Sequence, residues 1–165
     1  MQRTPQCTVF STGVNDDEAV IRQYADMVYR LAWAYVRNNT DADDVFQEVF
    51  LRYIRRAPEF ETEEHRKAWL LRVTINRAKS HLAGSRLRGI SFREESVPFT
   101  APEEMELHEA LLKLPPKYRT VLHLFYYEDQ TTEEIAELLQ RKPATVRTQL
   151  TRAREQLAKL LSEDI

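Results

Sequence analysis

The segment from Thr131 to Arg154, TTEEIAELLQRKPATVRTQLTRAR, most strongly constrains the fold of this chain. Apolar residues recur at i, i+4, i+7 and i+11 from the second half of this segment onwards: Val146, Leu150, Ala153 and Leu157. This spacing brings side chains to one face of an α-helix. Another face carries cationic and hydroxyl side chains: Arg147, Thr148, Thr151 and Arg152. An apolar stripe docks a helix on a core, whereas Arg and hydroxyl groups suit phosphates and base edges.

Local signals divide this segment into two helices joined by a tight turn. Thr131 and Glu134 have the spacing of a capping box, and Pro143 suits the first turn of the second helix. Gln140 stands in the turn, where many helix-turn-helix motifs use glycine for a positive backbone angle. We expect a distorted turn rather than the loss of the motif. The pattern predicts a helix-turn-helix with a recognition helix, and a helical hairpin with a solvated basic face is the alternative.

Composition limits the class of protein. A chain of 165 residues fits one domain or two small ones, and only three glycines with few β-branched alternations favour an all-α fold. No apolar run approaches the roughly 20 residues that span a bilayer, and the N-terminus does not have the pattern of a secretory signal. Cys7 is the single cysteine, which excludes an internal disulfide and fits a reducing cytoplasm. We therefore expect a soluble cytoplasmic protein.

The formal net charge of −2 conceals strong segregation of charge along the chain. Eight Lys or Arg residues and no acidic residue lie between Arg66 and Arg93, whereas six Glu and no Lys or Arg lie between Glu94 and Glu109. The stretch from Arg141 to Lys159 is basic again, with Glu155 as its one acidic residue. Two basic blocks separated by an acidic connector indicate two nucleic-acid surfaces that need a partner to act.

The pattern of elements predicts two small helical domains joined by a flexible acidic linker. We expect a disordered leader over 1–16, a helical domain over 17–84, the linker over 85–101 and a C-terminal helix-turn-helix domain over 102–165. In the first domain we expect helices over 17–37, from an N-cap at Thr40 to Arg56, and from 62–66 to Leu82. In the second, helices over 102–113 and 115–127 precede the two described above.

Three stretches in this order resemble one family. They are DADDVFQEVFLRYIRR over 41–56, KAWLLRVTINRAKSHL over 67–82, and the whole segment over 107–157. Together they resemble the bacterial RNA polymerase sigma factors of the extracytoplasmic-function (ECF) group, over nearly all of 24–161. In that family the first stretch is a polymerase-clamp-binding helix, the second engages the minus-ten promoter element, and the third binds the minus-thirty-five element.

The resemblance implies three sets of binding residues. Asp44, Gln47 and Glu48 would meet a coiled coil of the largest polymerase subunit. The minus-ten set is Arg72, Asn76, Arg77 and Lys79. The minus-thirty-five set is Lys142, Thr145, Arg147, Thr148, Thr151, Arg152 and Arg154, with Lys142 and Arg154 on backbone phosphates. The loop over 59–66 would hold unpaired bases, with Phe60 and His65 as contributors, while Trp69 reads as a core residue.

The implied partners are core RNA polymerase (its clamp coiled coil and the flap of the second-largest subunit), promoter DNA and an inhibitory anti-sigma factor. A small-molecule substrate is not expected, nor is a cofactor. The four histidines lack short metal-ligand spacing, and no phosphate-cradling glycine loop or nucleophile elbow occurs, so catalysis is not expected. A conventional helix-turn-helix regulator and a protein-binding adaptor remain as alternatives. Two domains packed together in the free chain would hide DNA-facing residues.

Overall fold

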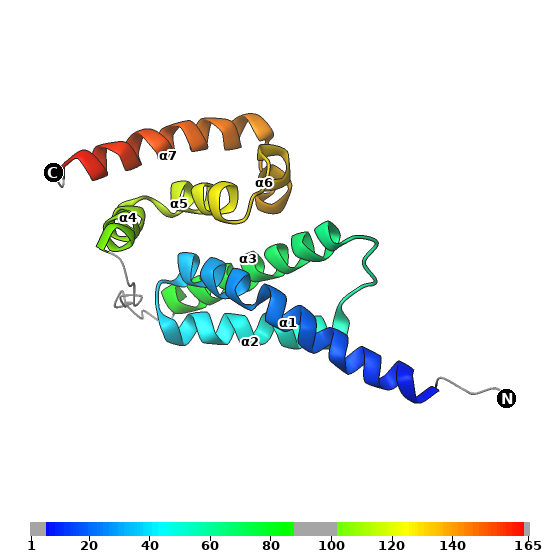
Figure 1. Ribbon diagram of the computed structural model, residues 1–165. Coiled ribbons are helices and arrows are strands. Elements are labelled where there is room, and N and C mark those ends of the chain that lie inside the picture. Colours follow the sequence, from blue (N-terminus) through cyan, green and yellow to red (C-terminus); the bar gives the residue numbers. More distant parts are fainter. Residues whose placement is uncertain (1–5, 88–101, 164–165) are drawn as a thin grey trace.

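The computed structural model describes the backbone of residues 6–87 and 102–163 and the side chains of most of them (Figure 1). Within these ranges every regular element is a helix, which confirms the all-α prediction. The predicted linker lies mainly in 88–101, outside the described residues. None of the described helices combines the length and apolar character that a membrane span requires.

The first domain consists of α1 (Gln6–Val36), α2 (Asn39–Arg56) and α3 (Glu63–Leu87). One residue from each helix, Leu31, Val45 and Leu70, is completely buried in their common core. Each helix repeats such residues at three- and four-residue intervals, so one side packs inward and the other faces solvent. Figure 1 shows the three helices lying against one another below the second domain.

The helix ends of the first domain differ from the predicted ones. Residues 6–16, predicted as part of a disordered leader, belong to α1, which contains no proline that would interrupt it between Gln6 and Val36. The N-cap of α2 is Asn38 rather than Thr40: its side-chain Oδ1 accepts from the Asp41 amide at 2.7 Å, and its Nδ2 donates to the Asp41 carboxylate at 3.0 Å. Asn is at least as good a cap as Thr, and this one is itself buried.

The third helix is longer than predicted. It continues through Gly84 to Leu87, although Gly84 was expected to end the domain. A single glycine inside a helix costs only about 1 kcal/mol relative to alanine, so tertiary packing can carry a helix through it. Ser85, which follows Gly84, is buried and provides such packing.

The second domain consists of α4 (Pro102–Lys113), α5 (Pro116–Leu122), η1 (His123–Tyr127), α6 (Thr132–Leu139) and α7 (Pro143–Glu163). The helix predicted over 115–127 is therefore divided, with a π-helical turn in its second half. The Glu128 amide donates to the His123 carbonyl at 3.3 Å, five residues back, which closes the wider turn. Figure 1 shows α7 on the side of this domain away from α1–α3.

The helix-turn-helix forms as the local signals indicated. Thr131 and Glu134 make both hydrogen bonds of the capping box, at 3.1 and 3.2 Å. Pro143 is the first residue of α7. The buried face of this helix contains Val146, Leu150 and Ala153. Gln140 adopts the left-handed conformation, with φ 55° and ψ 49°, and its amide donates to carbonyls of the preceding turn. The turn is therefore intact without glycine.

The two domains contact each other directly. Arg119 of α5, only 4% exposed, donates through Nε to the carbonyl of Ala34 at 2.9 Å. That carbonyl belongs to the last turn of α1, where carbonyls have no partner within the helix and a cation is favoured. A cavity of about 330 Å³ adjoins this contact and is lined by residues of α1, α4, α5 and η1, including Trp33 and His123.

Replacing Gln140 with glycine should stabilise the second domain. A non-glycine residue in the left-handed region costs about 1 kcal/mol, so we expect Gln140→Gly to raise the free energy of unfolding by about that amount. Urea denaturation of the full chain measures the change. Glu137→Gly, at a helical position of α6 that is also exposed, is the matched control and should lower stability by up to about 1 kcal/mol. A lower midpoint for Gln140→Gly would contradict the strain argument.

Candidate nucleic-acid interface

The outer face of α7 forms one continuous polar surface. Its cations and hydroxyls are exposed, while the residues between them in the sequence are buried against α5 and α6. All seven residues of the predicted minus-thirty-five set are exposed: Lys142, Thr145, Arg147, Thr148, Thr151, Arg152 and Arg154. The structure thus brings this set together on one helix and the turn before it.

Two arginines of this surface already have partners. Arg147 lies 3.8 Å from the Glu133 carboxylate of α6. A backbone hydrogen bond, the Thr132 hydroxyl and the charge of Arg147 hold the pKa of Glu133 below its ordinary value. Arg154 donates through Nε to the Tyr126 hydroxyl at 2.7 Å, and its guanidinium lies over that ring. The Tyr126 side chain therefore restricts the orientation of Arg154 in the absence of a ligand.

The predicted minus-ten set divides between two faces of α3. Arg72, Asn76 and Lys79 recur at i, i+4 and i+7 and are exposed in one row. Arg77 is half-buried instead, in a groove of about 280 Å³ between α2 and α3. All four residues were predicted to lie on a nucleic-acid surface, but their helical positions bring only Arg72, Asn76 and Lys79 to the same side.

The groove around Arg77 contains more cations than its sequence neighbourhood suggested. Residues of α2 line its other wall: Glu48, Leu51, Arg52, Arg55 and Arg56. Four guanidinium groups thus meet where two helices cross, beside a single carboxylate. Sequence reasoning missed this surface because the cations come from stretches more than twenty residues apart; only the packing of α2 on α3 unites them.

The exposed side of α2 carries acidic, amide and apolar side chains. Asp44, Gln47 and Glu48 are all exposed there, as required for contact with a partner. Leu51 and Ile54 follow them along the same side of the helix and are 46% and 52% exposed, so two large apolar side chains three residues apart lie beside these polar groups. Sequence reasoning did not select these two residues. Their helical positions, which do not fall on the buried face that contains Val45, could have indicated that they are exposed.

The N-terminal part of α2 lies beside His81 of α3. His81 Nε2 lies 3.2 Å from the Glu48 carboxylate, and one ligand atom each of Asp41, Asp44 and His81 lies within 4.8 Å of the others. Short spacing along the chain gave no sign of this cluster. Its hydrogen bonds, including that from Asn38 to Asp41, join the cap and first turns of α2 to α3.

The loop before α3 is ordered by aromatic packing. Phe60 lies edge-on to Trp69 and His65, with ring centroids 5.8 and 5.3 Å apart, and stacks on Tyr53 at 6.3 Å. Trp69 therefore packs within the domain, as predicted. At the start of α3, the Tyr24 hydroxyl donates to Glu63 at 2.8 Å, and burial together with that carboxylate raises the pKa of Tyr24 to about 12.

Comparisons with known proteins agree with this geometry. Residues 20–88 match the family model for sigma-70 region 2, and residues 104–157 match that for sigma-70 region 4. The sigma factor SigV of Bacillus subtilis is 32% identical over 76% of this chain and 78% of its own length. The ECF sigma factor SigW of the same species is 30% identical over 87% of this chain and 88% of its own length.

The fold also matches a solved structure, that of the sigma factor RpoE in complex with the anti-sigma factor NepR from Bartonella quintana. The match has a TM-score of 0.77 and covers 91% of this chain and 99% of that one, at 21% identity. The two matched regions coincide with the two domains seen here, and each contains one of the exposed cationic helices. The chain therefore belongs to the ECF group of RNA polymerase sigma factors, which are transcription initiation factors and not enzymes.

Proposed function

We propose that this chain binds core RNA polymerase in the cytoplasm, directs it to promoters with two DNA elements and helps to open the duplex at the nearer one. The observation that supports this most directly is the distribution of exposed charge. Each domain has its own cationic helix face, α3 in the first and α7 in the second, and α2 adds an acidic and apolar face of different chemistry. Two DNA contacts and one protein contact fit these three surfaces.

The second domain recognises the minus-thirty-five element through α7. The helix enters the major groove with its N-terminal half, where Thr145, Thr148 and Arg152 reach base edges and phosphates. Lys142 and the N-terminal end of α7 hold the phosphate backbone. Arg147 exchanges its weak contact with Glu133 for DNA, because an exposed ion pair is worth little in water.

The first domain melts the minus-ten element through α3 and the loop before it. Opening a duplex requires unpaired bases to be held by stacking and by hydrogen bonds to their edges. The row of Arg72, Asn76 and Lys79 follows the backbone of the captured strand. Phe60 supports the loop through its packing, which leaves His65 as the exposed ring available to a base.

Polymerase binds the exposed side of α2. A basic coiled coil in the clamp pairs with the polar side chains of Asp44, Gln47 and Glu48. The apolar core of this interface is supplied by Leu51 and Ile54. The second domain contacts the flap. An anti-sigma factor holds the chain inactive, a proposal supported by the fold shared with RpoE, which was solved with the anti-sigma factor NepR.

Run-off transcription tests the central proposal. Core polymerase with this chain should initiate at promoters that core polymerase alone does not use, because the chain supplies sequence recognition and strand opening. Promoters selected from a random library by the reconstituted holoenzyme provide the templates. Sequence-specific binding of duplex DNA by the chain alone, with no effect on polymerase, would show a conventional helix-turn-helix regulator instead.

Removing a cation from α7 should weaken promoter binding by the holoenzyme. For Arg147→Ala or Arg152→Ala we expect a cost of roughly 1–3 kcal/mol where a bidentate base contact is lost, with relaxed preference at that base. Where only a phosphate contact is lost, the slope of log affinity against log salt should fall by about one. Salt-titrated binding measures both. Lys159→Ala, exposed near the other end of α7, is the control, and an equal loss there would refute the assignment.

Removing a charge from the exposed side of α2 should weaken binding to core polymerase. Asp44→Asn keeps the shape of the side chain and removes its charge, so we expect about a threefold to tenfold loss of affinity, with a smaller dependence on salt. Asp43→Asn is the matched control, since Asp43 is adjacent and exposed but lies toward α1 beside Tyr29. Fluorescence anisotropy of labelled chain with core polymerase measures both. Equal losses for the two variants would exclude a specific role for Asp44.

A further inference from the structure

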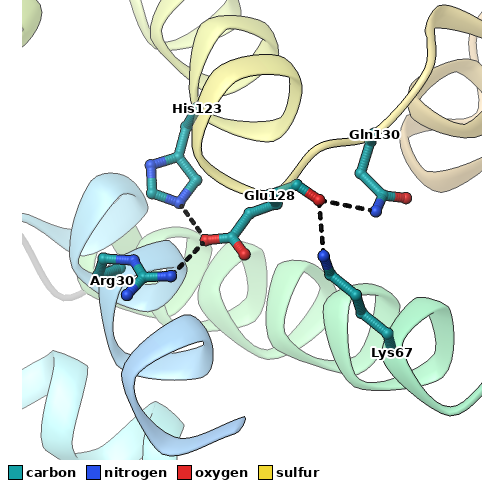
Figure 2. A network of polar contacts seen from close by, with 5 residues as sticks. All are labelled: Arg30, Lys67, His123, Glu128 and Gln130. Carbon is teal, nitrogen blue, oxygen red and sulfur yellow. Dashed lines mark hydrogen bonds and ion pairs between the residues drawn. The ribbon is translucent and has the colours of Figure 1, made fainter. Parts of the chain in front are cut away.

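The charged side chains drawn in Figure 2 have partners within the chain. The carboxylate of Glu128, only 2% exposed, accepts from Arg30 at 3.3 Å and lies 3.2 Å from His123 Nε2. Lys67 donates through Nζ to the backbone carbonyl of Glu128 at 2.8 Å. Charged groups that are removed from water are stable when they are paired in this way. A half-buried cation that lacks such partners is a candidate for binding an anion from outside the chain.

The groove between α2 and α3 contains a cation of this kind together with three more. We call it the arginine groove, and its guanidinium groups are those of Arg52, Arg55, Arg56 and Arg77. Within residues 6–87 and 102–163, none of these four guanidinium groups has a hydrogen bond or an ion pair. The one carboxylate that lines the groove, Glu48, lies 3.2 Å from His81 Nε2. Four positive charges thus face one negative charge that already has a partner.

The sequence of α2 brings three of these cations to one face. Residues 48, 51, 52, 55 and 56 recur at intervals of three and four, so their side chains project to the same side of the helix. Like charges at such spacing repel each other and destabilise a helix. The helix dipole favours Arg55 and Arg56, which lie in the last turn, but its effect has declined at Arg52, one turn earlier. An anion bound in the groove would relieve this repulsion.

Arg77 completes the groove from α3. It is half-buried, whereas the three arginines of α2 are exposed. Removing part of a guanidinium from water has a cost in free energy, which a hydrogen-bonded anion offsets. Partial burial also reduces screening by salt, so an anion beside Arg77 is held more strongly than one on an open surface.

The shape of the groove selects the kind of anion. Its volume of about 280 Å³ suits a compact group, and its cations converge from two helices instead of forming a row along one. The row of Arg72, Asn76 and Lys79, on another side of α3, has the arrangement that suits a DNA strand. Linked phosphates concentrate several negative charges in a small volume, and the planar fork of arginine binds phosphate oxygens in pairs. The arginine groove therefore fits a short phosphate chain better than a strand of nucleic acid.

We propose that the arginine groove binds a compact oligophosphate, which is either the phosphate chain of a nucleotide or a short inorganic polyphosphate. Arg77 binds the anion from α3, and the three other arginines bind it from α2. Leu51 also lines the groove and is 46% exposed, so it offers an apolar contact that a nucleotide can use and an inorganic chain cannot.

The arginine groove adjoins the surface proposed for polymerase. Glu48 and Leu51 line the groove and also belong to the exposed side of α2. A bound oligophosphate covers part of that side and adds negative charge beside it, so it competes with polymerase. The anion site is a property of the chain alone, whereas this competition rests on the proposed function.

Isothermal titration calorimetry of the full chain with tripolyphosphate, in the absence of divalent cations, tests the site. We expect saturable binding to a single class of site. Arg77→Gln should weaken it at least about tenfold, because a charge-assisted hydrogen bond to phosphate is lost. Arg22→Gln is the matched control. It removes an exposed cation of the same domain that lies outside the groove and pairs with Glu18, and it should change the affinity by less than about twofold.

Arg52→Gln provides a second variant at an exposed position of α2 and should also weaken binding. Circular dichroism checks that Arg77→Gln keeps its helices, and Arg52→Gln carries the test alone if it does not. Two further probes distinguish the sources of phosphate. If ATP binds more tightly than tripolyphosphate and loses this advantage in Leu51→Ala, the site is one for a nucleotide. If the two bind equally, the phosphate chain itself is the ligand.

Three results would overturn the site. They are the absence of tripolyphosphate binding, equal losses for Arg77→Gln and Arg22→Gln, and an affinity for sulfate equal to that for tripolyphosphate. The last two would mean that net charge alone explains the binding.

Fluorescence anisotropy of labelled chain with core polymerase separates the site from the proposed function. Tripolyphosphate should weaken polymerase binding by the parent chain and do so less for Arg77→Gln, and an equal effect on both chains would overturn the competition. If the groove binds tripolyphosphate and the chain binds no polymerase, the site stands and the proposed function fails. If Arg77→Gln binds tripolyphosphate as the parent does but binds polymerase less tightly, the groove takes carboxylates of polymerase and the oligophosphate site fails.

Discussion

The structure depends on the division of single helices into a buried and an exposed side. α7 buries Val146, Leu150 and Ala153 completely or nearly so, and the residues between them, apart from the half-buried Gln149, are cations and hydroxyls that face solvent. α2 and α3 repeat this division around the core of the first domain. Because burial of the apolar stripe fixes the rotation of each helix about its axis, it also fixes the direction of every exposed side chain. The packing of each helix on its core is therefore sufficient to orient its binding surface.

Features with a local cause were the ones that the sequence predicted well. The capping box at Thr131, the start of α7 at Pro143 and its apolar stripe each need only a few neighbouring residues. Where local signals competed, the prediction was less accurate. Asn38 and Thr40 are both good caps, and burial of Asn38 decides between them. Gly84 is a weak stop signal, and packing of the residue after it carries α3 further.

Surfaces made by two elements were beyond sequence reasoning. Arg77 was assigned to the same surface as Arg72, yet five residues along a helix turn a side chain well away from its starting direction. The groove it occupies contains arginines of α2 that lie far away in sequence. The burial of Arg119 and Glu128 could not be predicted, because a charged residue in a sequence is expected to be exposed until its partner is known. Each has one partner on the other domain, which is the carbonyl of Ala34 for Arg119 and the guanidinium of Arg30 for Glu128.

The same contact accounts for a DNA-binding chain with a formal net charge of −2. Salt screens exposed charges that lie farther apart than the Debye length of about 8 Å, so DNA recognition depends on the charge of the face that meets DNA rather than on the net charge of the chain. Where the two domains contact each other, Asp129, Glu134 and Glu137 of the second domain share a cleft with Lys67 and Arg72 of α3, which weakens the positive field at these two cations. Separation of the domains would remove these carboxylates from the neighbourhood of Arg72. A change in domain arrangement can therefore alter DNA affinity without altering a single charge, which is why a partner that binds both domains has the means to control it.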